Sequence, residues 1–151
     1  MRLELEVQNA SSCADVPSQE VLERWAGAAF RERKSRAELV IRIVDEAEGA
    51  ALNRQYRHKE GATNVLSFPF EPPPGVSTRI VGDLVLCAPL VIREAAEQGK
   101  TAQAHWAHLV VHGVLHLLGH DHRNDEEAAE MEGLEIEILT ELGFADPYLD
   151  H

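Results

Sequence analysis

The chain has 151 residues, of which 44% are hydrophobic and 26% charged, and its formal net charge is −12. These values predict one soluble domain over residues 1–151, with no transmembrane segment and no secretory signal. The acidic balance excludes a broad basic footprint of the kind that DNA-binding proteins use. Two cysteines without a CxxC spacing favour free thiols in the reducing cytoplasm.

Taken in chain order, the sequence predicts four strands and five helices. A strand is indicated where apolar residues alternate with charged ones or β-branched residues accumulate, and a helix where apolar residues recur every three or four positions. Ser18 is the expected N-cap of the first helix, and Asp45 with Glu48 is the expected capping pair of the second. The expected elements are a strand at 3–7, a helix at 18–30, a strand at 38–44, a helix at 45–56, strands at 64–70 and 80–87, and helices at 88–98, 102–119 and 125–142.

This order of elements predicts an α+β fold: a small four-stranded mixed sheet packed with about five helices, and a metal site at the end of a central helix. The strand order does not follow from the pattern. Trp106 is expected in the core, as is one face of the last helix. The tail after Gly143 is expected to be loose. The apolar face of the last helix consists of Met131, Leu134, Ile138 and Leu142.

The segment HGVLHLLGHDH, residues 112–122, predicts a metal site. His112 and His116 stand four residues apart, so one helix face presents both imidazoles. His108 lies on this face too, but eight residues from His116, about 12 Å along the axis, which is too far to share one ion. Gly119 permits a left-handed turn that ends the helix and returns His122 to the other two. Three such histidines predict one zinc ion per chain, with a coordination position left open.

Several alternatives remain at this site. The spacing H-x-x-x-H-x-x-G-x-x-H is that of metzincin proteases, but Gly113 stands where those enzymes carry the glutamate base, so a peptidase is the less favoured reading. His120 is an alternative third ligand. Asp121 is expected either to orient a ligand imidazole or to cap the next helix. His105 and His108 are expected to be structural or to support a ligand.

At these residues the sequence resembles the YbeY family of bacterial endoribonucleases. The family motif HGxLHLxGyDH differs only at His120, where tyrosine is usual. Four further segments fit the family: LNRQYRHKEGATNVLSFPF at 52–70, with Glu60 where aspartate is usual, GDLVLC at 82–87, AAEQGK at 95–100 and MEGLEIEILTELGFADPY at 131–148. The resemblance covers most of the chain from about residue 40 onward.

The resemblance implies a metal-dependent hydrolase that cleaves single-stranded RNA. It implies action in ribosomal RNA maturation, notably at the 3′ end of the small-subunit RNA, and in ribosome quality control. The expected partners are therefore ribosomal RNA, the ribosome or its small subunit, and assembly proteins. It also implies that His112, His116 and His122 bind zinc and that Arg57 is the functionally important arginine.

Arg57 is the expected catalytic residue, since a planar and permanently charged guanidinium stabilises charge on phosphoryl oxygens. It lies in a locally basic stretch with Arg54 and Lys59, whereas residues 123–151 carry ten acidic residues and one basic residue. Asp83 is expected either to support catalysis or to be a polar residue at a strand end. Two attacking groups fit the sequence: a metal-activated water, which leaves a 5′-phosphate, or the substrate 2′-OH, which leaves a cyclic phosphate. A zinc-stabilised ribosome-assembly factor without nuclease activity is the competing function.

Overall fold

The centre of the molecule is a four-stranded sheet with the strand order β1-β2-β4-β3. The computed structural model describes residues 2–31, 36–76, 78–121 and 123–148. The first three strands of that order pair in parallel, whereas the last one, β3, is antiparallel to its neighbour β4. The predicted mixed sheet is therefore confirmed, and its order is now defined. The strands are β1 (Arg2–Asn9), β2 (Arg36–Val44), β3 (Val65–Pro69) and β4 (Ile80–Cys87).

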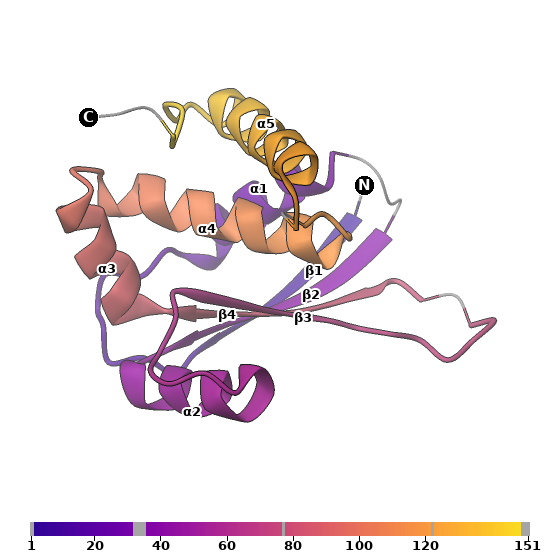
Figure 1. The fold of residues 1–151 in the computed structure, drawn as a ribbon, viewed down its shortest axis with the longest axis horizontal. Helices are drawn as coiled ribbons and strands as arrows, with labels where there is room; N and C mark the ends of the chain where they lie inside the picture. The colour runs from indigo at the N-terminus through magenta and orange to yellow at the C-terminus, as the bar shows by residue number, and fades with distance from the viewer. Residues whose placement is uncertain (1, 32–35, 77, 122, 149–151) are drawn as a thin grey trace.

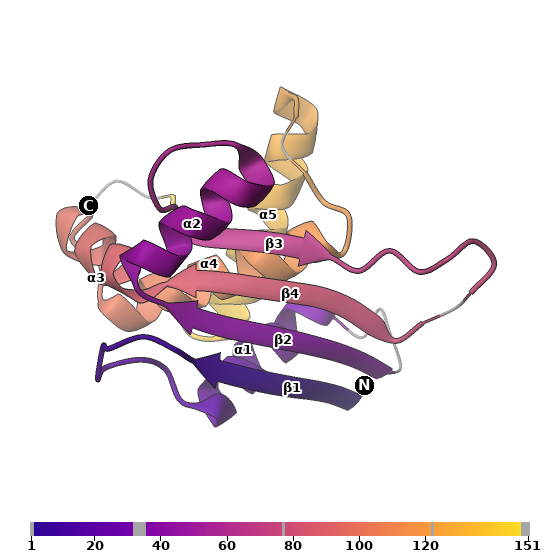
Figure 2. The same ribbon diagram turned by 90° about the horizontal axis from the view of Figure 1, so that it is seen from below.

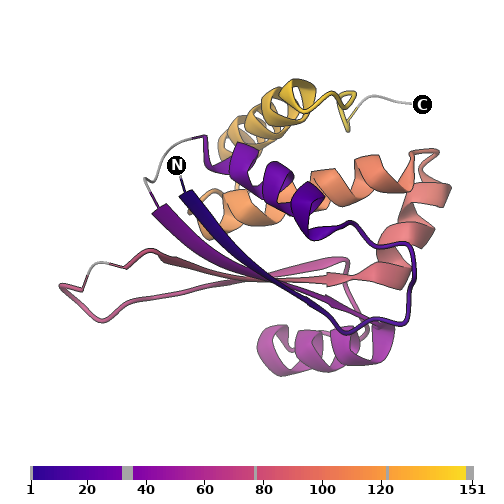
Figure 3. The ribbon, with the colours of Figure 1, turned by 180° about the vertical axis from the view of Figure 1, so that it is seen from behind.

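Helices lie on both faces of the sheet, unequally (Figures 1 and 3). On one face lie α1, α4 and α5, while α2 lies on the other; α3 leads from β4 to the start of α4. The α+β class and the five helices are as expected. Their bounds are α1 (Gln19–Phe30), α2 (Glu46–Arg57), α3 (Ala88–Glu97), α4 (Ala102–Leu117) and α5 (Asp125–Glu141).

The predicted central helix is α4, which lies between the sheet and α5. Its residues are mostly buried, including Trp106, which is 1% exposed. Met131 and Ile138 of α5 are buried against the same core, and Leu134 and Leu142 are partly buried there. Both core expectations are therefore confirmed. α4 ends at Leu117, two residues before the predicted end.

The two expected helix caps have different outcomes. Ser18 caps α1 as predicted, since its hydroxyl accepts a hydrogen bond from the amide of Val21 at 3.3 Å. The predicted capping pair of α2 is wrong. Asp45 is the N-cap residue, but its carboxylate accepts from the amide of Ser12 at 3.0 Å. Glu48 pairs with Arg42 of the adjacent strand at 2.5 Å, so tertiary partners replace the local ones.

The tail after α5 is ordered by contacts, contrary to expectation, as far as residue 148. Gly143 takes a positive φ of 94°, which turns the chain back at the end of the helix. Phe144 then lies edge-on to Trp25, with ring centroids 6.0 Å apart. Asp146 accepts a hydrogen bond from the amide of Tyr148 at 2.8 Å. The packing of Phe144 on Trp25 joins residues far apart in the sequence and therefore has no local signature. Residues 149–151 lie outside the described part.

Two expectations from composition can also be compared with the structure. Cys13 and Cys87 are free thiols, as their spacing predicted. No helix within the described ranges is long and apolar enough to cross a bilayer. The proline-rich segment 71–75 lies in the connection between β3 and β4, which extends beyond the sheet (Figure 2).

Candidate active site

A cleft of about 590 Å³ borders β3, which is one of the two edge strands of the sheet. An edge strand has a neighbour on one side only, so its other side is available to line a cleft. α4 contributes two histidines, and the end of α2 contributes Tyr56 and Arg57. Among the described residues, the cleft is lined by Tyr56, Arg57, Thr63, Asn64, Val65, Leu66, Ser67, Phe68, His112, His116 and Asp121.

His112 and His116 present their imidazoles to each other on successive turns of α4. Their Nε2 atoms lie 3.1 Å apart, and their ring centroids are 4.6 Å apart. Two nitrogen ligands of a tetrahedral zinc ion, each at roughly 2.0–2.1 Å from the metal, are about 3.3 Å apart. The two nitrogens therefore fit neighbouring positions around one ion.

The chain turns away directly after this pair, as Gly119 predicted. Gly119 has a φ of 101°, its amide donates to the carbonyl of His116, and the amide of His120 donates to the carbonyl of Leu115, both at 3.0 Å. This pair of bonds is the Schellman ending of a helix, which needs a left-handed residue that glycine supplies. Asp121 comes next and lines the cleft. The predicted third ligand, His122, lies outside the described residues.

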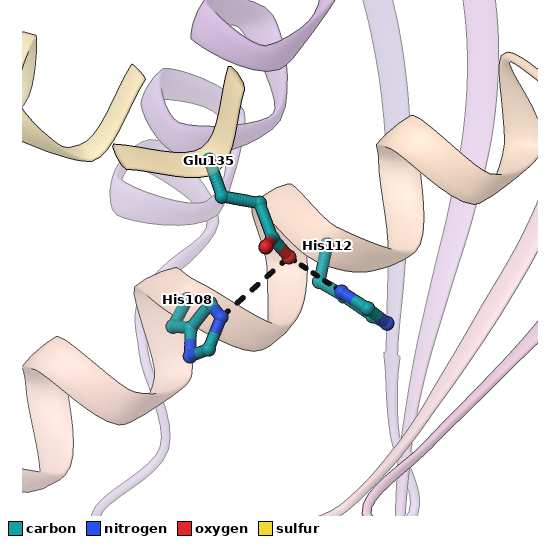
Figure 4. A group of neighbouring side chains, drawn as sticks. All are labelled: His108, His112 and Glu135. Atoms are coloured by element: carbon teal, nitrogen blue, oxygen red, sulfur yellow. Dashed lines mark hydrogen bonds and ion pairs between the residues drawn. The ribbon is translucent and has the colours of Figure 1, made fainter. Parts of the chain in front are cut away.

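A buried carboxylate on α5 lies against the other edge of His112. Oε1 of Glu135 accepts a hydrogen bond from Nδ1 of His112 at 2.5 Å, and it lies 3.5 Å from Nε2 of His108. Figure 4 shows this carboxylate between the two imidazoles, with the second ring nitrogen of His112 pointing away from it. The hydroxyl of Tyr148 donates to Oε2. Burial alone would raise the pKa of Glu135, but the hydrogen bonds outweigh it and lower that pKa to about 2.

Glu135 was not among the predicted site residues, because in the sequence it stands within an acidic segment. A signal was present. Glu135 stands four residues after Met131 and three before Ile138, on the buried stripe of α5. An acidic residue on such a stripe is rarely buried without partners.

His108, His112 and Glu135 form a group that could hold a metal ion, with one ligand atom of each within 4.8 Å of the others. His112 thus belongs to two candidate donor sets, one with His116 and one with Glu135. These donor groups support the expectation that residues of the central helix α4 can hold a metal ion.

Arg57 lies in the same cleft as the two histidines, although 55 positions separate it from His112. It is the last residue of α2 and is exposed, so its guanidinium is accessible from solvent. Arg54 and Lys59, the other predicted basic residues, are exposed but do not line the cleft. The structure therefore brings together Arg57, His112 and His116, three of the four predicted site residues.

Comparison with known proteins gives the family of this chain. The endoribonuclease YbeY family matches residues 6–143. The chain belongs to this family. The endoribonuclease YbeY of Pseudomonas putida is 57% identical over 149 residues, which cover 98% of this chain and 94% of the relative. That of Nitrosococcus oceani is 55% identical over 150 residues, which cover 98% of each chain.

Membership of the YbeY family confirms the resemblance found in the sequence, and with it the assignment to a class of nucleases. The fold is also similar to the solution structure of TM1509 from Thermotoga maritima, with a TM-score of 0.57. That similarity covers 95% of this chain and 99% of the other at 22% identity, and it concerns the fold alone.

Gly113 is the position at which this YbeY family member lacks the protease glutamate. It is buried where α4 crosses the sheet, and a Cβ atom there would lie 2.7 Å from Cδ2 of Leu84 and 3.4 Å from Cγ2 of Val65. Leu84 is fully buried, so it has little space to yield. A glutamate side chain at 113 would therefore point into the packed layer between helix and sheet.

The remaining candidate residues lie outside the cleft. Asp83 is exposed on β4 and borders a different hollow together with Leu52 and Val85. His105 is 3% exposed and lies 2.9 Å from Glu94 through Nε2, as expected of a structural histidine. His108 contacts Glu135, which fits its expected supporting role.

Proposed function

We propose that this chain is a zinc-dependent endoribonuclease that cleaves single-stranded RNA. The observation that carries the proposal is that Arg57 and the paired Nε2 atoms of His112 and His116 line one cleft. An anion-binding guanidinium beside a metal-ligand pair is the combination that phosphodiester cleavage needs. The YbeY family membership and the names of the relatives support the same substrate class.

In this proposal His112, His116 and His122 hold one zinc ion per chain. Zinc bound in this way supplies a Lewis acid and lowers the pKa of a bound water towards ~7. Arg57 binds the non-bridging oxygens of the phosphodiester and orients it in the cleft. Because Asp121 is the one carboxylate among the described lining residues, little acidic charge opposes an RNA backbone there.

The cellular setting is proposed from the resemblance to the family. It comprises the cytoplasm, maturation of the small-subunit ribosomal RNA at its 3′ end, ribosome quality control, and contact with the small subunit and assembly proteins. The acidic remainder of the surface suits a protein that meets its RNA through a local site, because a net charge of −12 provides no general attraction.

Cleavage of an end-labelled single-stranded RNA tests the proposal, with zinc content measured on the same preparations. Arg57→Ala should lower kcat/KM by about 100-fold or more, as expected when a group that stabilises transition-state charge is removed, and should retain zinc. Arg54→Ala is the matched control: it removes an exposed arginine one turn earlier on α2 that does not line the cleft, and it should retain most activity. Identical cleavage by wild type, Arg57→Ala and His116→Ala would identify a contaminant and reject the nuclease.

Analysis of the RNA ends in that assay distinguishes the two attacking groups. Attack by water leaves a 5′-phosphate and a 3′-OH. Attack by the 2′-OH leaves a 2′,3′-cyclic phosphate and a 5′-OH. A substrate with 2′-deoxyribose at the cleavage position remains cleavable only in the first case.

The net charge of −12 favours one rival, a zinc-stabilised assembly factor that binds a basic ribosomal protein and cleaves nothing. If this rival is correct, removal of zinc should unfold the domain, and Arg57→Ala should change binding without any effect on cleavage. The peptidase alternative is disfavoured by the packing of Gly113 on Leu84. Gly113→Glu should therefore yield a destabilised protein without peptide cleavage, and a gain of such cleavage would revive the alternative.

A further inference from the structure

Two imidazoles and one hydroxyl from two other segments lie against the carboxylate of Glu135 on α5. Its side chain is 0% exposed, a costly position for a carboxylate unless donors compensate. Nδ1 of His112 and Nε2 of His108 reach it from α4, and the hydroxyl of Tyr148 reaches it from the C-terminal tail. In Figure 4 the carboxylate lies between the two histidines.

The hydrogen bond to His112 assigns the tautomer of that imidazole. An ionised carboxylate can only accept, so the proton of neutral His112 lies on Nδ1. Nε2 is then the nitrogen with the lone pair, and it faces His116 at 3.1 Å. A metal-ligating histidine commonly has its other nitrogen bonded to a carboxylate in this way, and the bond sets the orientation of the ring.

The short distance between Oε1 of Glu135 and Nδ1 of His112 argues against Glu135 as a metal ligand beside that nitrogen. Two ligand atoms around a tetrahedral zinc ion lie about 3.3 Å apart. Glu135 and His112 are separated by 2.5 Å, which suits a shared proton and leaves no room for an ion between them. Glu135 therefore acts on a metal through His112.

The C-terminal tail completes this arrangement. The turn at Gly143 and the packing of Phe144 on Trp25 bring the tail back over α4 and α5. The hydroxyl of Tyr148 donates to Oε2 of Glu135 and lies 3.3 Å from Nε2 of His108, from which it can accept. Tyr148 thus holds the carboxylate oxygen that His112 does not use.

We propose that Glu135 is a positioning residue that holds His112 with Nε2 directed at the metal, and that Tyr148 makes the C-terminal tail part of this support. This inference rests on the zinc site of the proposed function. It adds two residues from α5 and the tail, neither of which touches the metal.

Zinc affinity tests the inference without any RNA, by competition with a chromophoric chelator. Glu135→Leu should lower affinity about 10- to 100-fold, the range for loss of such a supporting group. Glu135→Gln keeps an acceptor and should fall between Leu and wild type. Tyr148→Phe should show a smaller loss, about 3- to 10-fold, because it acts one bond further away. Glu132→Gln, an exposed change on the same helix, should bind as wild type does.

A second readout distinguishes positioning from general structural support. In metal-free wild type, ¹⁵N spectra of His112 should report a proton on Nδ1, and Glu135→Leu should shift the population towards the Nε2–H form while the amide spectrum of the sheet stays unchanged. A proton on Nε2 in wild type would overturn the inference, as would wild-type zinc affinity in both Glu135→Leu and Tyr148→Phe.

Failure of the proposed function and failure of this inference give different results in these experiments. A wild type that binds no zinc removes the zinc site and this inference together. A wild type that binds zinc without cleaving RNA removes the nuclease and leaves the inference intact. A loss in Glu135→Gln as large as that in His116→Ala would make Glu135 itself a ligand, which overturns its role as a positioning residue.

Discussion

The Nε2 atoms of His112 and His116 lie 3.1 Å apart, on successive turns of one helix. If they are neighbouring ligands of one ion, loss of either imidazole should lower zinc affinity by more than the 10- to 100-fold expected for a supporting residue. We therefore expect His116→Ala to be purified with less than about one tenth of the wild-type zinc, as measured by elemental analysis. His58→Asn is the control, because His58 is exposed at a left-handed position that asparagine tolerates. Full zinc content in His116→Ala would exclude this residue as a ligand.

Gly113→Ala should destabilise the protein. A methyl group at this position would lie 2.7 Å from Leu84, and overpacking of a core costs typically 1–3 kcal/mol. The better helix propensity of alanine returns up to about 1 kcal/mol. We expect a net loss of about 1 kcal/mol in the free energy of unfolding, measured by urea denaturation.

Gly133→Ala is the matched control for this substitution. Gly133 is exposed on α5, and a Cβ atom there would meet nothing within 4 Å. The same substitution should therefore stabilise the protein by up to about 1 kcal/mol. Equal effects at the two positions would show that contact with Leu84 does not matter.

Tyr56→Ala should weaken RNA binding if the cleft holds a single strand. Tyr56 is 56% exposed in the cleft wall and lies edge-on to Phe68, with ring centroids 5.1 Å apart. Stacking of a base on an aromatic side chain is worth about 1–3 kcal/mol, so KM should rise about 5-fold or more with little change in kcat. Tyr56→Phe retains the ring and should behave as wild type. If Phe and Ala are equally impaired, the hydroxyl rather than stacking is responsible.

The stability of the metal-free protein should fall as the pH is lowered below about 6.5, in part because of His105. Burial lowers the pKa of His105 from its ordinary value of 6.5. Below 6.5 the unfolded chain therefore takes up a proton that the folded chain resists, and stability decreases until the pH reaches the folded pKa. At pH 5.5 the loss is up to about 1.4 kcal/mol.

His105→Gln removes this titration and provides the measurement. The change in urea midpoint between pH 7.5 and pH 5.5 should be smaller in the variant than in wild type. An identical change in both proteins would contradict the assignment. Carboxylates away from this position titrate alike in both proteins, so the difference between them reports His105 together with its partner Glu94, which lies 2.9 Å away.

The sequence by itself was sufficient for the elements and for the local part of the site. Strand and helix periodicity is a property of neighbouring residues, so the four strands and five helices followed from it. The spacing of His112, His116 and Gly119 is local too, since one helix and its glycine turn determine where these residues lie. The capping pair of Asp45 and Glu48 failed because Ser12, 33 positions before Asp45, and Arg42, on the preceding strand, bind these carboxylates instead.

Only the tertiary structure decided which residues from distant segments join the candidate site. The strand order leaves β3 at the edge, and this edge position lets the end of α2 bring Arg57 to the histidines of α4. Glu135 reaches His112, and Tyr148 reaches Glu135, only because α5 and the tail fold back over α4. Local pattern can define a helix face and its turn, whereas the partners of that face depend on long-range packing, which short-range periodicity does not encode.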